Sequence, residues 1–309
     1  MPDSQPPATH KTHPRLPGPV RGGLWMTGAC VCFASMNAII RHLSAELPPF
    51  EIVFFRNLMG LAFMLPWLIR AGPAALRTAN QKLYVGRALI GLASMLLWFS
   101  ALALMPLAEA TALSFTAPLF ATICAVVVLG ETVRLRRWTA TIVGFAGAMI
   151  VLRPGFQAIG LPELLVLASA ATAGLSAITV KQLTRSEPPN AIVTYMTLYI
   201  MPPSLVFALF VWVTPPWATI PWLVVLGLFA TLGHQAMTRA FVATDTSLVM
   251  SFDFARLPFV AIIAWFAFGE TPDIWTWVGA AVIVAATVYI AHRESRLARA
   301  PPSAPAPPV

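Results

Sequence analysis

The chain has 309 residues, of which 58% are hydrophobic and only 10% are charged. Because soluble domains carry about 25% charged residues, this composition excludes an ordinary soluble fold. The net charge of +8 could suit a nucleic-acid partner, so the distribution of the basic residues along the chain has to decide that question.

Long apolar runs follow one another from residue 20 onward. A membrane-spanning helix needs about 20 mostly apolar residues, and we place ten such runs at residues 20–40, 49–69, 83–104, 106–128, 137–153, 162–180, 190–213, 219–242, 246–268 and 274–291. Stretches such as residues 161–180 do not alternate between apolar and polar residues, which excludes the strands of a membrane β-barrel. The sequence therefore predicts an all-α membrane protein with ten transmembrane helices.

The two ends of the chain differ from its apolar middle. Residues 1–19 are rich in proline and polar residues, and the segment 293–309 ends in a run of almost only proline and alanine. We predict that both ends are disordered and cytoplasmic. The first apolar run is longer than the core of a signal peptide, so we expect it to be retained as a span.

The basic residues indicate an orientation in the membrane. Sixteen of the 20 Lys and Arg residues, with Arg87 counted among them, fall in the tails and alternate loops, and the opposite loops hold only Arg41 and Arg153. The remaining two, Arg56 and Arg256, lie within spans. Because cytoplasmic loops are enriched in Lys and Arg, both termini are predicted to be cytoplasmic, which requires an even number of spans. The positive charge then needs no nucleic-acid partner.

An internal repeat divides the chain into two halves. Residues 47–53, with sequence LPPFEIV, match residues 187–193, with sequence EPPNAIV, and the Gly-Glu pair at 130–131 matches the pair at 269–270. Chance similarity between two apolar segments is the alternative, but proline, glycine and charge coincide in order. We therefore predict two five-helix units, at residues 20–155 and 156–292.

An odd number of helices in each unit has a consequence for the mechanism. If the first unit enters the membrane from the cytoplasm, the second must enter from outside, so the repeat is inverted. Secondary transporters commonly use this symmetry, which lets one scaffold open to either side of the membrane, with the binding site near the midplane. We expect transport by alternating access.

Several segments carry a resemblance to a known family. They are residues 47–56, residues 107–120 with sequence LAEATALSFTAPLF, and the two Gly-Glu pairs at 130–131 and 269–270. On these residues the chain resembles the EamA-type branch of the drug/metabolite transporter superfamily, and looks most like members named for S-adenosylmethionine or riboflavin uptake. The resemblance implies ten helices, cytoplasmic termini and a central cavity lined by both halves, with Glu131 and Glu270 as parts of the scaffold. Amino-acid exporters share that scaffold, so substrate and direction stay open.

Charges within spans are the first candidates for a substrate site. An arginine near the centre of a membrane helix costs about 2.5 to 3.5 kcal/mol on insertion scales, and Arg56 lies in the second span, where the other half has Met196. We interpret Arg56 as a ligand for an anionic group of the substrate. A structural bond to carbonyls or to a neighbouring acid is the alternative.

A second pair of charges lies in the ninth span. Asp253 and Arg256 are three residues apart, and on one helical face they would neutralise each other. A purely structural pair and a working pair are both open. The matching segment of the first half, residues 113–120, is uncharged, and such asymmetry within a symmetric fold favours a site. We also expect Pro118 and Pro258 to interrupt spans four and nine.

His234 and Gln235 lie in the eighth span, opposite the uncharged Trp98 of the other half. Histidine is the side chain best suited to titrate near neutral pH, so His234 and Asp253 are the candidate proton carriers. Trp98 and Tyr195, with Tyr199 one turn further on, are candidates for stacking on a flat substrate ring. Hydrogen bonding in the interior and ordinary packing are the alternatives for these residues.

The class of function follows from what the motifs exclude. The chain has none of the His-Glu-x-x-His, Gly-x-Ser-x-Gly or phosphate-binding glycine motifs, so we predict that it is not an enzyme. Cys30, Cys32 and Cys124 fall within spans and are interpreted as small apolar residues, with no metal or cofactor. We predict a secondary-active transporter of a small organic metabolite in a bacterial-type inner membrane. A membrane-embedded enzyme and a receptor are the rival classes, and the oligomeric state is open.

Overall fold

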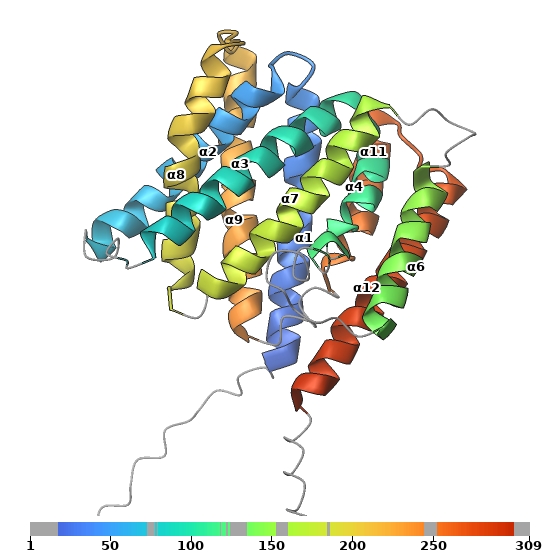
Figure 1. Ribbon diagram of the computed structural model, residues 1–309. Coiled ribbons are helices and arrows are strands. Elements are labelled where there is room, and N and C mark those ends of the chain that lie inside the picture. Colours follow the sequence, from blue (N-terminus) through green and yellow to red (C-terminus); the bar gives the residue numbers. More distant parts are fainter. Residues whose placement is uncertain are drawn as a thin grey trace, which may run out of the picture.

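The computed structural model is a bundle of helices (Figure 1), and it describes residues 18–72, 78, 80–117, 119–121, 123, 135–152, 160–183, 186–243 and 252–299. The α-helices in this part of the chain are α1 (Gly18–Leu43), α2 (Pro49–Ala71), α3 (Gln81–Leu104), α4 (Leu107–Ser114), α6 (Leu135–Leu152), α7 (Leu161–Leu183), α8 (Pro189–Leu209), α9 (Ile220–Ala243), α11 (Arg256–Phe268) and α12 (Ile274–Arg299). A short 3-10 helix, η2 (Trp217–Thr219), precedes α9.

Each of the ten predicted apolar runs overlaps one of these α-helices. Five helical stretches are long and apolar enough to cross a membrane: Val20–Leu43, Pro49–Ala71, Gln81–Leu104, Asn190–Leu209 and Trp217–Ala243. Shorter apolar helices lie in α4, α6, α7, α11 and α12. The part of the chain that the structure describes is thus helical, with several helices apolar enough for a membrane, as the composition predicted.

The repeated Pro-Pro motif sets the start of a helix in both halves. Pro48 and Pro188 are N-cap residues, and Pro49 and Pro189 are the first residues of α2 and α8. Proline suits the first turn because the N–H that it lacks would have no partner there, and because its fixed φ already fits the helix. The motif is thus a pair of helix-start signals.

The Gly-Glu pair after α11 has a different structural role. Gly269 adopts the left-handed conformation, with a φ of 66°, and its N–H bonds the carbonyls of Ala264 and Trp265. A residue with a side chain is strained in that conformation, so glycine is the natural helix terminator. The matching residues Gly130 and Glu131 lie outside the described residues.

Both halves contain a break at corresponding positions. Helix α4 ends at Ser114 and a turn follows at Phe115 and Thr116, while a turn at Phe254 and Ala255 precedes α11. The prediction that Asp253 and Arg256 lie in the middle of one helix is therefore wrong, because the turn separates them. Pro258 falls in the first turn of α11, where proline breaks no hydrogen bond, and Pro118 lies outside the described residues.

Helices from the two ends of the sequence pack directly on each other. Helix α1 packs along α9, α6 along α12, α3 along α7, and α2 against α8 and α9. Helices α6 and α12 approach each other closely, since a Cβ added to Gly279 would lie 2.6 Å from the carbonyl oxygen of Gly147. Small residues allow such contact between membrane helices. Gly147 thus serves a contact within this chain.

The ends of the bundle can be told apart by the chain ends. The first residues of α1 and the last residues of α12 lie at the same end, at the bottom of Figure 1, where Gly18 also approaches the carbonyl of Ala243 at the end of α9. We call this the termini end. The far end is where α1 finishes and α12 begins.

Candidate functional site

Arg56 is enclosed within the bundle. Its side chain projects from the second turn of α2, and the residue is only 3% exposed. One guanidinium nitrogen, Nη1, donates to Asn57 Oδ1 at 2.8 Å, and Asn57 Nδ2 in turn donates to the carbonyl of Val53 at 2.7 Å. The alternative of a neighbouring acid is not realised among the described residues, because Arg56 forms no ion pair there.

A second arginine, Arg87, joins Arg56. The loop assignment of Arg87 is wrong, because it lies in the second turn of α3. The helices that carry Arg56, Arg87 and His234 pack together, because α2 contacts both α3 and α9. The three side chains thus come from one packed group of helices. Arg87 Nη2 lies 3.4 Å from Met196 Sδ, and its Nε is buried without a hydrogen-bond partner. We call Arg56, Arg87 and His234 the guanidinium cluster.

The side chains of α9 complete this cluster from the second half of the chain. The His234 ring meets Phe33 of α1 edge-on, with 5.1 Å between ring centroids. Gln235 is 8% exposed, and its Nε2 lies 3.3 Å from Met64 Sδ, while its Oε1 is buried without a partner. Thioether sulfur is a weak acceptor, so the amide of Gln235 keeps most of its hydrogen-bonding capacity.

The predicted aromatic candidates have protein partners. Trp98 Nε1 donates to Asn37 Oδ1 at 3.3 Å, which links α3 to α1. Tyr195 stacks on Tyr84, with centroids 4.4 Å apart and 28° between the ring planes, and Tyr199 follows at 5.4 Å. One face of Tyr195 is therefore covered by Tyr84 of α3.

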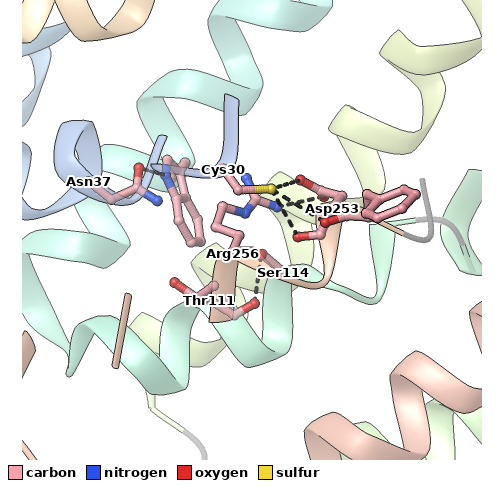
Figure 2. Close-up of polar contacts among 8 residues, drawn as sticks. Cys30, Asn37, Thr111, Ser114, Asp253 and Arg256 are labelled. Carbon is pink, nitrogen blue, oxygen red and sulfur yellow. Dashed lines mark hydrogen bonds and ion pairs between the residues drawn. The ribbon is translucent and has the colours of Figure 1, made fainter. Parts of the chain in front are cut away.

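Asp253 and Arg256 form an ion pair across the turn before α11. Arg256 Nη2 lies 2.9 Å from Asp253 Oδ2, and Figure 2 shows the pair beside Cys30 and above Ser114. Cys30 Sγ is 3.5 Å from the carbonyl of Phe252 and 4.0 Å from Asp253 Oδ1. We call Cys30, Asp253 and Arg256 the break cluster.

The break cluster also contacts the break in the first half. The Arg256 guanidinium lies 5.6 Å from the ring centroid of Phe115, and the rings of Phe115 and Phe254 meet edge-on at 5.1 Å. The predicted mutual neutralisation of Asp253 and Arg256 is realised here. Helix α1 contributes to both regions, with Cys30 at the break cluster and Phe33 against His234.

At the far end, an ion pair connects the two halves. Arg41 Nη2 of α1 lies 2.5 Å from Glu270 Oε1, and Glu270 Oε2 accepts a hydrogen bond from the backbone N–H of Leu107 at 3.0 Å. Arg41 also donates to the carbonyls of Leu102 and Met105. Glu270 therefore joins the end of α1 and the start of α4 to the segment after α11.

Glu51, at the start of α2, is a buried acid that the sequence analysis missed. It is fully buried, its Oε2 accepts from the N–H of Val213 at 3.1 Å, and its Oε1 has no partner. Trp212 lies beside it against Phe55, with 5.7 Å between ring centroids. These contacts hold the segment between α8 and η2 against α2. The sequence offered one signal: in the internal repeat, the acidic Glu51 aligns with the uncharged Ala191.

No group of three or more His, Cys, Asp or Glu side chains that could hold a metal ion occurs in the described part of the chain. Cys30 and Cys32 are free thiols there, and Cys124 lies outside it. The described side chains offer hydrogen-bond donors from two arginines and an amide, together with an acid–base pair at the break.

Comparison with known proteins identifies the scaffold. The family described as the EamA-like transporter family matches residues 20–153 and again 160–291. A riboflavin transporter of Rhizobium johnstonii is 34% identical over 91% of this chain and 94% of its own length. An S-adenosylmethionine uptake transporter of Rickettsia prowazekii is 30% identical over 90% of this chain and 94% of its own, and a pseudopaline exporter of Pseudomonas aeruginosa is 29% identical over 86% and 94%. The chain therefore belongs to the EamA-like transporter family, as a multi-pass membrane transporter of a metabolite and not an enzyme.

Proposed function

We propose that this protein is a secondary-active transporter that takes up a small ring-bearing metabolite across a bacterial-type inner membrane by alternating access. Riboflavin and S-adenosylmethionine, the substrates in the names of two relatives, are the candidate classes. The observation that carries the proposal is the guanidinium cluster, because Arg56 and Arg87 come from the first half of the chain and His234 from the second. A site shared by two halves can change its exposure when the halves move against each other.

The arrangement of the helices is consistent with an inverted repeat of residues 20–155 and 156–292. The corresponding helices α1 and α7 run in opposite directions, α1 from the termini end and α7 from the far end (Figure 1). The Pro-Pro helix starts and the two breaks also correspond. Because most Lys and Arg residues fall in the tails and alternate loops of the sequence, the proposed orientation has both termini in the cytoplasm.

Energy for transport would come from a gradient, since the sequence has no phosphate-binding glycine motif. Asp253 and His234 are the proposed proton carriers. Asp253 Oδ2 holds Arg256 at 2.9 Å. A proton bound at that carboxylate would neutralise it and release the guanidinium. Proton binding would thus change the contact across the turn before α11, where the two halves meet.

Export is the second candidate, and the similarity to the pseudopaline exporter over 86% of the chain favours it. The same scaffold would then carry the substrate outward. The amphoteric set of Arg56, His234, Asp253 and Arg256 would suit amino-acid-like molecules as well.

Uptake in matched auxotrophs tests the proposal. Expression in strains that cannot make riboflavin, or cannot make S-adenosylmethionine, should restore growth on a low concentration of one of these compounds. Labelled compound should accumulate saturably and should leave the cells when the proton gradient is collapsed. Failure of both strains to grow, with the protein present in the membrane, would contradict uptake. Faster loss of preloaded label would then indicate export.

A further inference from the structure

Arg56 and Arg87 place two positive charges inside the bundle, and the residues that the structure describes supply no acid to neutralise them. Neither arginine forms an ion pair with any acid of the described residues, where the pairs found are Arg41–Glu270 and Asp253–Arg256. The helices that carry the two arginines, α2 and α3, pack on each other, and like charges in one packed region repel each other. Buried charges in a membrane protein are normally paired, because the desolvation of an unpaired charge is costly. This cluster therefore favours a group that arrives from outside the chain.

The hydrogen-bond inventory of the cluster shows which kind of group it lacks. Each guanidinium carries five N–H donors and no acceptor. The described acceptors are Asn57 Oδ1 for Arg56 and the weakly accepting Met196 Sδ for Arg87, whose Nε has no partner. Donors exceed acceptors, so the missing group is one that supplies acceptors.

We propose that Arg87 is a second substrate-binding residue, and that Arg56 and Arg87 together form a subsite for an edge of the substrate with two oxygen acceptors and no positive charge. This inference rests on the proposed function and deepens it. A planar guanidinium recognises paired oxygens through two parallel N–H···O bonds, which a point charge such as lysine cannot reproduce. Two chemical groups offer such an edge. A carboxylate presents both oxygens to one guanidinium, whereas on the dicarbonyl side of a flavin-type ring an N–H separates the two carbonyl oxygens, so that each would accept from a different arginine.

The symmetry of the scaffold supports a role in recognition. Arg56 aligns with Met196 of the second half, and Met196 is the residue that Arg87 contacts. A charge needed only to hold the fold together would be expected in both halves. Here both arginines come from the first half, as a substrate that is not itself symmetric would require.

Exchange in proteoliposomes tests the subsite, with labelled riboflavin and labelled S-adenosylmethionine as probes. Decarboxylated S-adenosylmethionine lacks only the carboxylate, and lumichrome keeps the dicarbonyl ring without the sugar-like chain. If S-adenosylmethionine is exchanged, its decarboxylated form should compete at least about 10-fold more weakly. If riboflavin is exchanged, lumichrome should compete. A charged hydrogen bond accounts for a factor of this size.

The variants Arg87→Gln and Arg87→Lys separate recognition from folding. Arg87→Gln should weaken competition by the compound that carries the two oxygens, S-adenosylmethionine or riboflavin, about 10-fold. Competition by decarboxylated S-adenosylmethionine should stay unchanged. Arg87→Lys should give values between those of Arg87→Gln and the wild type. Arg239→Gln is the matched control, since Arg239 is exposed on α9 and lies over the ring of Trp25.

The two ways of failing are distinguishable. Normal exchange by Arg87→Gln with the wild-type preference, or equal weakening of every probe in both Arg87 variants, would overturn the subsite alone. Exchange of neither labelled probe by the wild-type protein would overturn the proposed function and the subsite with it.

Discussion

Removing the charge of Glu270 should open the far end of the bundle. Glu270 pairs with Arg41 of α1 and accepts from the N–H of Leu107, so it holds three segments together at that end. Glu270→Gln keeps an acceptor for Leu107 and removes the ion pair. The loss should shift the conformational equilibrium towards a form that is open at the far end.

The size of the shift follows from the burial of the pair. The side chains of Arg41 and Glu270 are 24% and 18% exposed, so the pair is partly buried. Exposed ion pairs stabilise a protein by about 0–1 kcal/mol, and breaking a buried pair costs about 3–5 kcal/mol. We expect about 1–2 kcal/mol, or roughly a 5- to 30-fold change in the population of the open form. The double variant Arg41→Gln/Glu270→Gln should match the single variant, because the pair is already lost in either.

Thiol labelling measures this population. Ser114 lies seven residues after Leu107 on α4 and beside Arg256 (Figure 2). A cysteine there is about 10 Å further into the bundle than Leu107, where Glu270 closes the far end. In a variant without the native cysteines, Ser114→Cys should react about 5- to 30-fold faster with a membrane-impermeant reagent after Glu270→Gln. The acceleration should appear only when the reagent is added on the side of the far end. Right-side-out and inside-out vesicles distinguish the two sides.

Asp273→Asn is the control for this measurement. Asp273 Oδ1 accepts from the N–H groups of Trp275 and Thr276 at the start of α12. The asparagine oxygen can still accept these bonds, so the variant removes one negative charge without breaking the Arg41–Glu270 pair. Equal labelling rates in wild type and Glu270→Gln, or the same acceleration in Asp273→Asn, would refute the closure.

Three further predictions concern the site and the packing. Arg56→Gln should lower the transport rate at least about 10-fold, with Arg56→Lys recovering only part of it, because Arg56 is buried and shares Arg87's deficit of acceptors; wild-type kinetics in labelled uptake would contradict this. Asp253→Asn should retain substrate binding but remove the dependence of flux on a pH gradient, and unchanged coupling in vesicles would exclude Asp253 as the proton carrier. Gly279→Leu should lower the thermal stability of the purified protein, because its Cβ would meet the carbonyl of Gly147 at 2.6 Å, whereas Gly28→Ala, with no atom within 4 Å, should not; equal melting temperatures would contradict the close packing.

The helices could be predicted because the membrane constrains them strongly. Apolar runs, Pro-Pro starts and the glycine after α11 are local signals, each tied to the backbone of one element. The pairing of Asp253 with Arg256 could also be anticipated, since a spacing of three residues brings two side chains together in a helix. The structure shows that the same spacing brings them together across the turn that precedes α11.

Arg87 escaped prediction for a physical reason. A basic residue near the end of an apolar run can extend to the cytoplasmic surface or turn inward, and only packing against α8 decides which. Its place within the predicted span 83–104 was the available signal. Glu51 escaped because its partner, the N–H of Val213 at 3.1 Å, is distant in the sequence. An interruption of span nine was predicted from Pro258, but the break lies at Phe254 and Ala255, ahead of that proline. Its exact place has no local signal in the sequence.

Counterflow in proteoliposomes tests the central claim most directly. Liposomes containing the purified protein are loaded with unlabelled riboflavin or S-adenosylmethionine and placed in a low concentration of the labelled compound. If the protein exposes one site alternately to the two sides, label should enter transiently above its outside concentration, saturably, and much less with Arg56→Gln. Label that enters no faster than in protein-free liposomes, for both compounds, would contradict the account.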